Sequence, residues 1–217
     1  MHKPDGLVGD DVREALEWDN AIDDGRIMVQ VKDGKVTLSG AVHTYAEALK
    51  AMEDTKHVKG VRDIENQLLV GPAGEAVTDA VLLEACEKAL DGNPFVPKGA
   101  VSVAARDGWV TLTGDVRHHY QRDAAEDAVS WQQGVTGITN ELKMTPNPIP
   151  SDVADRINKA IGRSSILDDS VIKVSNQGST VYLDGEVSSY YARVTAEDTA
   201  WNAPGVGGVV DRLLVTS

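Results

Sequence analysis

The side chains best suited to catalysis are few and widely separated along this sequence of 217 residues. None of the five histidines stands in an H-x-x-x-H spacing with a glutamate, which would place two imidazoles and a carboxylate around zinc. The sequence also contains no G-x-S-x-G, no P-loop and no G-x-G-x-x-G, the patterns that position a nucleophile or cradle phosphates. We therefore expect a protein with no catalytic residues and no cofactor.

Two stretches carry metal-binding residue types at spacings that fit a metal poorly. They are the adjacent pair His118-His119 and the acidic run from Asp19 to Gly25. The acidic run fails as an EF-hand loop because the twelfth position counted from Asp19 is Gln30 and not glutamate. A metal pair or an ion at the turns stays open as an alternative, but we favour a solvated helix start and a solvated loop, and expect no metal site.

Several aromatic side chains do not fit the core positions of the chain. Trp109 precedes Val110 in an apolar stretch and should point away from the face that Val110 buries. Aromatic residues outside a main core either pack between domains or form a surface for lipid or protein. Both interpretations stay open for the four residues that we single out as candidate binding residues, which are Trp109, Tyr120, Tyr190 and Tyr191.

These residues stand on a unit that the chain repeats three times. The stretch Val36-Thr37-Leu38-Ser39-Gly40 returns as Val110-Thr111-Leu112-Thr113-Gly114 and as Val181-Tyr182-Leu183-Asp184-Gly185. A Gly-Val pair follows each of these glycines after twenty residues. A period this long indicates one small domain per copy rather than a hairpin of a solenoid. The glycines that we expect to have a structural role are Gly40, Gly60, Gly114, Gly134, Gly185 and Gly205.

The residue pattern of each copy predicts two helices and three strands in the order αββαβ. In the first copy, apolar residues have helical spacing over 7–18, and alternation with a period of two begins at Ile27. Asp33-Gly34 indicates a hairpin turn, and Thr44-Tyr45-Ala46-Glu47 predicts a capping box at a second helix. A third strand follows Gly60. The expected domains are 1–70, 75–145 and 150–217.

The predicted fold class is α+β, with a three-stranded mixed sheet in each domain and both helices on one face of that sheet. The opposite face would show Met28, Gln30, Thr37 and Ser39, and would be solvated or covered by a neighbour.

Composition and charge exclude several classes of protein. The net charge is −13, and no cluster of Lys and Arg could bind nucleic acid, which needs a basic patch. The single cysteine, Cys86, excludes an intramolecular disulfide and a multi-thiolate zinc site, and we expect it to be a small buried hydrophobic residue. No run approaches the roughly 18 apolar residues of a membrane span. The first residues lack a signal peptide, so the printed sequence predicts a cytoplasmic protein, or a periplasmic one if a signal peptide has been removed.

The chain resembles the BON family (bacterial OsmY and nodulation), also called transport-associated domains. In the first copy the resemblance rests on Asp33-Gly34, on Val36 to Val42, on Gly60-Val61 and on Asn66. The equivalents in the second copy are Asp107-Gly108, Gly114-Asp115-Val116, Gly134-Val135 and Asn140. The third copy matches less closely, with Gly178 displaced by one position and Asp211 in place of the asparagine.

The resemblance implies an αββαβ fold and a non-enzymatic role. Members of the family are associated with osmotic and envelope stress, and some bind phospholipid surfaces. The chain is most similar to the soluble bacterial members that have three domains and no signal sequence. The resemblance transfers no binding residue to this chain.

We therefore expect a non-enzymatic binding or adaptor protein that contacts a phospholipid surface or a protein partner through its repeated domains. Three similar weak faces on one chain would gain avidity through effective concentration. The alternative is a cytoplasmic sensor of potassium or another cation, in which backbone carbonyls and acidic turns bind the ion. The net acidity fits this alternative, although such a site leaves no sequence motif.

Overall fold

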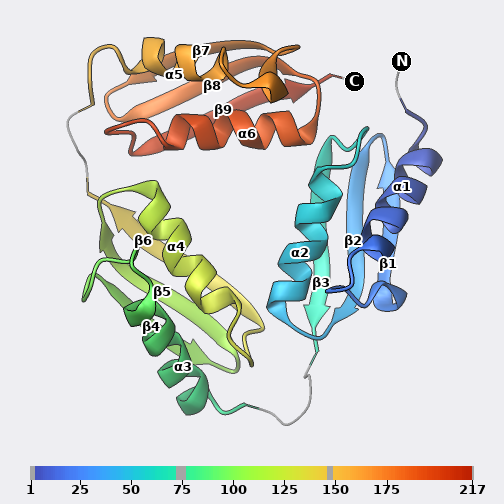
Figure 1. The fold of residues 1–217 in the computed structure, drawn as a ribbon, viewed down its shortest axis with the longest axis vertical. Helices are drawn as coiled ribbons and strands as arrows, with labels where there is room; N and C mark the ends of the chain where they lie inside the picture. The colour runs from blue at the N-terminus through green and yellow to red at the C-terminus, as the bar shows by residue number, and fades with distance from the viewer. Residues whose placement is uncertain (1–2, 72–76, 146–148, 217) are drawn as a thin grey trace.

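A computed structural model describes residues 3–71, 77–145 and 149–216 of the chain (Figure 1). It confirms the predicted α+β fold, with three units of the order αββαβ. Domain 1 contains α1 (Asp5–Trp18), β1 (Ile27–Lys32), β2 (Lys35–Val42), α2 (Tyr45–Lys56) and β3 (Asp63–Val70). Domain 2 contains α3 (Asp79–Gly92), β4 (Val101–Arg106), β5 (Trp109–Val116), α4 (His119–Ser130) and β6 (Gly137–Met144). Domain 3 contains α5 (Val153–Ile161), β7 (Val171–Gln177), β8 (Thr180–Val187), α6 (Tyr190–Trp201) and β9 (Gly208–Val215).

Each domain has one mixed sheet with its second strand in the middle. In domain 1 the order is β1-β2-β3, with β1 antiparallel to β2 and β3 parallel to it. The parallel pair needs a crossover, and α2 supplies it. Two short 3₁₀ turns, η1 (Asp24–Arg26) and η2 (Ser165–Leu167), precede the first strands of domains 1 and 3.

The core of each domain lies between its two helices and one face of its sheet. In domain 1, Val36 and Leu38 are fully buried against Val8 and Val12, as their alternate and helical spacings predict. Cys86 of α3 is fully buried in the domain 2 core, which confirms its prediction as a small buried residue. The other sheet face is open, and Met28 on it is exposed.

The glycine that ends the repeated pattern of each copy lies where the backbone at the start of the neighbouring strand comes closest. Gly40 has φ of +117°, and a Cβ at this position would lie 2.1 Å from the carbonyl oxygen of Arg26. Gly114 and Gly185 have the same conformation, and their Cβ atoms would meet a carbonyl oxygen at 2.0 Å. Only glycine fits both the positive φ and this contact.

The capping box predicted at Thr44 is half formed. The Thr44 hydroxyl accepts a hydrogen bond from the amide of Glu47 at 3.1 Å, as predicted. The Glu47 carboxylate instead accepts from the amides of His43 and Asp23, each at 2.7 Å. This carboxylate therefore ties the start of α2 to the loop before β1 and is buried there.

The first helix of domain 1 begins at Asp5, two residues before the predicted start, and the Asp5 side chain is bonded to the β1–β2 hairpin. Its carboxylate accepts from the amides of Asp33 and Gly34 at 2.8 and 2.9 Å. Asp79 makes the same pair of bonds to Asp107 and Gly108 in domain 2. These bonds hold the pKa of Asp79 below its ordinary value.

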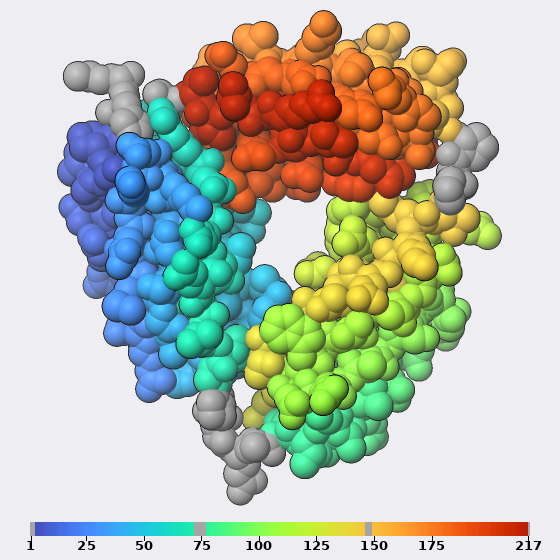
Figure 2. All heavy atoms as spheres, turned by 180° about the vertical axis from the view of Figure 1, so that it is seen from behind, coloured from blue at the N-terminus to red at the C-terminus, as the bar shows by residue number. Residues whose placement is uncertain are grey.

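The three domains are arranged as a ring, and α2, α4 and α6 are the helices nearest its centre (Figure 1). The space-filling view of Figure 2 shows an opening through the middle of the molecule. The helices α2, α4 and α6 follow one another head to tail. The start of α2 points toward domain 2, the start of α4 toward domain 3 and the start of α6 toward domain 1. Among the described residues no helix is long and apolar enough to cross a bilayer.

Candidate functional site

Trp109 lies at the start of β5 on the open face of the domain 2 sheet. Its indole is 50% exposed, whereas the adjacent Val110 is fully buried, as the alternation predicts. The ring lies against Gly137 of the parallel strand, where a Cβ would come within 2.3 Å of the indole. The indole Nε1–H donates to Oγ1 of Thr139 at 2.8 Å. The side chain is therefore held in one orientation, while about half of its surface remains in contact with water.

Tyr120 lies at the second position of α4 and belongs to a small exposed aromatic group. Its ring is 48% exposed, meets Phe95 edge-on at 6.3 Å and stacks on His118 at 5.5 Å. Phe95 is also exposed and is held by its loop, in which the Phe95 amide donates to Oδ1 of Asn93 at 3.0 Å. His118, Tyr120 and Phe95 form what we call the aromatic group of domain 2.

Tyr190 and Tyr191, the first two residues of α6, lie in the contact between domain 3 and domain 1. Tyr190 packs against the domain 1 core, and its amide donates to the carbonyl of Val61 at 3.2 Å. The Tyr191 ring lies 4.3 Å from the ring of His57. Lys56 Nζ stands 6.0 Å from the centre of the Tyr191 ring. These two tyrosines thus join parts of the chain that are distant in sequence.

The other two contacts between domains use the same helix position. Tyr45, the first residue of α2, packs against the domain 2 core. His119, the first residue of α4, stacks on Trp201 of domain 3 at 4.4 Å between ring centres. Burial raises the pKa of both Tyr45 and Tyr190, with smaller contributions from the nearby Glu126 and Asp63 carboxylates respectively.

Sequence reasoning did not identify Tyr45, His119 or His57 as residues that join domains, whereas Trp201 belongs to the aromatic residues outside the core for which packing between copies was one interpretation. The available signal was the repeat itself. Tyr45, His119 and Tyr190 occupy equivalent positions, and each carries a ring at the first turn of a helix. An aromatic or imidazole side chain at that position in all three copies predicts a shared role in joining domains more strongly than any one of the three residues does.

Charged side chains of domains 1 and 2 lie near Asp198 of α6 in domain 3. Burial raises the pKa of Asp198, Lys56 of domain 1 acts in the opposite direction, and Asp123 of domain 2 raises it further. The interdomain contacts therefore combine aromatic packing with charges of both signs.

The residues of metal-binding type have other partners. His118 is the N-cap of α4, and the His119 Nδ1 lies 2.6 Å from the Asp123 carboxylate. Asp19 pairs with Lys50 at 2.8 Å, and Asp23 lies 3.2 Å from Arg26. Within residues 3–71, 77–145 and 149–216, no group of three or more His, Cys, Asp or Glu side chains could hold a metal ion.

Comparison with known proteins gives matches for all three copies. The BON domain family matches residues 4–72, 78–146 and 151–217. The chain is 31% identical over 144 residues to "Osmotically-inducible protein Y" of Escherichia coli (strain K12), a match that covers 64% of this chain and 72% of that protein.

Two solved structures of Chlamydia trachomatis CdsD, described as a structural protein of the type III secretion system, also match. One covers 97% of this chain and 92% of that chain at 13% identity, with a TM-score of 0.27. The second, a C-terminal domain, covers 100% of both chains at 12% identity, again with a TM-score of 0.27.

Proposed function

Because the chain belongs to the BON domain family, we propose that it is a non-enzymatic adaptor of the osmotic or envelope stress response, which binds a phospholipid or protein surface. The stress role follows the name of its relative, the osmotically inducible protein Y. The binding role rests on the side chains of domain 2. The proposal assigns no reaction to the chain.

The observation that carries the binding role is the fixed and exposed indole of Trp109. An aromatic side chain that is already held in one orientation loses little conformational entropy when a partner covers it. Gly137 and Thr139 supply this constraint. Domain 1 has Lys35 at the position of Trp109, and Lys35 pairs with Glu65 at 2.7 Å instead. The indole is therefore a special feature of domain 2 and not a requirement of the fold.

The aromatic group of domain 2 is a second candidate contact. Phe95 and Tyr120 stand beside the start of α4, whereas Trp109 lies on the open sheet face. Tyr120 combines an apolar ring with a polar hydroxyl. Such a side chain suits the boundary between lipid headgroups and acyl chains, and it equally suits the centre of a protein interface. The two positions can be tested separately.

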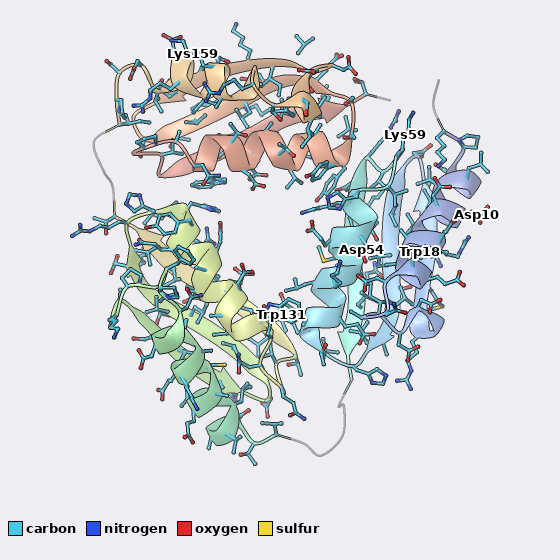
Figure 3. The ribbon with its side chains drawn as sticks, viewed as in Figure 1. Asp10, Trp18, Asp54, Lys59, Trp131 and Lys159 are labelled. Carbon is cyan, nitrogen blue, oxygen red and sulfur yellow. The ribbon has the colours of Figure 1, made fainter. Side chains whose placement is uncertain are left out.

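Vesicle flotation tests the proposal. The purified protein would be floated at near-physiological salt with vesicles of phosphatidylcholine alone and with vesicles containing phosphatidylglycerol. We expect the protein to float, and Trp109→Ala or Tyr120→Ala to weaken flotation. Trp18→Ala is the matched control, because Trp18 is 85% exposed but lies at the end of α1 in domain 1 (Figure 3).

The outcomes separate the two kinds of surface. Flotation that depends on Trp109 or Tyr120 supports a phospholipid surface. If the protein stays in the soluble fraction with both kinds of vesicle, the proposal that it binds phospholipid is wrong at any affinity that flotation detects. A protein partner would then be sought by cross-linking from position 109, and a cross-linked protein lost in Trp109→Ala would support the adaptor.

A further inference from the structure

The rings of Phe95 and Tyr120 stand at right angles to each other on the surface of domain 2. Their centres are 6.3 Å apart, and the angle between the ring planes is 89°. Both rings are exposed, Phe95 by 62% and Tyr120 by 48%. His118 stacks on Tyr120 with 11° between the ring planes. We call the right-angled pair, Phe95 with Tyr120, the aromatic corner.

Hydrogen bonds fix the position of one ring relative to the other. Phe95 lies in the loop after α3, where its amide donates to Oδ1 of Asn93 at 3.0 Å. The Asn93 side-chain amide in turn donates to the carbonyl of Ala124 at 3.1 Å, in the helix α4 that carries Tyr120. The two rings are therefore positioned before a ligand arrives, and covering them costs little conformational entropy.

The fold does not require rings at these two positions. Domain 1 has the same loop bond, in which the Ala21 amide donates to Oδ1 of Asp19 at 2.9 Å. The residues that correspond to the aromatic corner are Ala21 and Ala46 in domain 1, and Ile166 and Tyr191 in domain 3. A pair of aromatic rings at these positions is thus a feature of domain 2 alone, and its explanation lies outside folding.

The geometry of the aromatic corner suits a cation that carries methyl groups. The face of an aromatic ring is negative and attracts a cation within about 6 Å of the ring centre. Because the two centres are only 6.3 Å apart, one cation can lie within this distance of both. A quaternary ammonium group is weakly hydrated and presents apolar methyl groups to the rings, so it gains from cation–π attraction and from apolar burial. The net charge of −13 also draws cations toward the protein.

We propose that the aromatic corner binds quaternary ammonium ligands. This inference rests on the proposed adaptor function, because it assigns a class of ligand to one of the two candidate contacts in domain 2. Free choline and the headgroup of phosphatidylcholine carry the same trimethylammonium group, and both present it to Phe95 and Tyr120 in the same way.

Titration of choline with the full chain tests the site, followed by nuclear magnetic resonance of the choline methyl protons. Ring currents of Phe95 and Tyr120 should move this resonance upfield. The neutral analogue of choline, in which a carbon atom replaces the nitrogen, has the same shape without the charge and should bind at least about fivefold more weakly. A choline resonance that does not move overturns the proposal, and so does equal affinity for the two compounds.

Two substitutions separate the aromatic rings from their apolar bulk. Phe95→Leu keeps an apolar side chain but removes the ring, and should weaken choline binding about fivefold. Tyr120→Phe keeps the ring and should bind choline as the wild type does. Trp18→Ala is the matched control, because Trp18 is an exposed ring in domain 1. Wild-type affinity in Phe95→Leu, or an equal loss in Trp18→Ala, would overturn the proposal.

Flotation separates the two sources of the ligand. Choline binding and flotation with phosphatidylcholine that are both weakened in Phe95→Leu assign the lipid headgroup to the corner. Weakened choline binding with unchanged flotation assigns the free ligand. If the wild type binds choline but floats with neither kind of vesicle, the lipid adaptor fails and the aromatic corner stands. If it floats but does not bind choline, the aromatic corner fails and the lipid adaptor stands.

Discussion

At the scale of single residues, backbone geometry and burial account for the positions that the three copies share. Gly40, Gly114 and Gly185 are glycines because a Cβ would strike a backbone carbonyl oxygen at the start of the neighbouring strand. Cys86 fills a core position of α3, and burial raises the pKa of its thiol to about 11. Both features concern folding and not ligand binding.

The Gly40→Ala variant should be strongly destabilised. The added methyl group would lie 2.1 Å from the Arg26 carbonyl oxygen at a φ of +117°, and strain of this kind costs at least about 2 kcal/mol. Gly6→Ala is the control, because nothing lies within 4 Å of a Cβ at this position in α1. Urea unfolding followed by circular dichroism measures both. Equal midpoints would contradict the assigned role of Gly40.

Cys86 should react with Ellman's reagent only when domain 2 unfolds. Its thiol is fully buried, and the raised pKa leaves almost no thiolate at pH 8. We expect labelling in the folded protein to be at least about a hundredfold slower than in urea. Rapid labelling of the folded protein would show that α3 does not pack as described.

At the scale of helices and strands, the spacing of apolar residues predicted α1, β1 and β2 of domain 1, while the capping box predicted α2. Val36 and Leu38 on a strand, and Val8 and Val12 on a helix, show the two periods clearly and are all buried. Contacts between loops were harder to predict. Glu47 looked like half of a capping box, but its carboxylate bonds the Asp23 amide across the domain, and no local pattern encodes a partner 24 residues away.

Glu47→Ala should therefore cost more than Thr44→Ala. The hydroxyl of Thr44 satisfies one amide at the start of α2, and losing such a cap costs about 1 kcal/mol. The buried carboxylate of Glu47 satisfies the amides of His43 and Asp23, and its loss should cost about 2–3 kcal/mol. The urea midpoints of the two variants rank them. A larger loss in Thr44→Ala would contradict the described geometry.

The helix starts that join domains should also respond to alkaline pH. Burial raises the pKa of the Tyr45 and Tyr190 phenols above the ordinary value of 10.0. The closed arrangement of the three domains therefore favours the neutral phenols. The stabilisation is complete well below pH 10 and is lost as the pH rises above that value, because ionisation then favours the open form. Absorbance titration at 295 nm should show late-titrating tyrosines, and Tyr190→Phe should remove one of them. A titration unchanged by Tyr190→Phe would contradict the burial of that phenol.

At the scale of the whole molecule, the three domains that follow one another along the sequence form a closed ring. The repeat predicted the domains, because each carries its own core pattern. The closed arrangement of the domains was not predicted, because Tyr45, His119 and Tyr190 look like ordinary helix starts when each copy is taken alone, and only their recurrence at one position signals a shared role. The candidate binding residues were found as aromatic residues outside the core, but the sequence could not separate those that face water from those between domains.

The closing contact between domains 3 and 1 is the central claim, and a distance measured between these domains tests it most directly. Spin labels would be attached at Trp18→Cys and Lys159→Cys, exposed sites in domains 1 and 3, while the buried Cys86 remains unlabelled (Figure 3). Pulsed electron spin resonance should give one narrow distance distribution that broadens in Lys56→Glu/His57→Ala. A broad distribution in the wild-type chain, unchanged in that variant, would show that domain 3 does not close the ring.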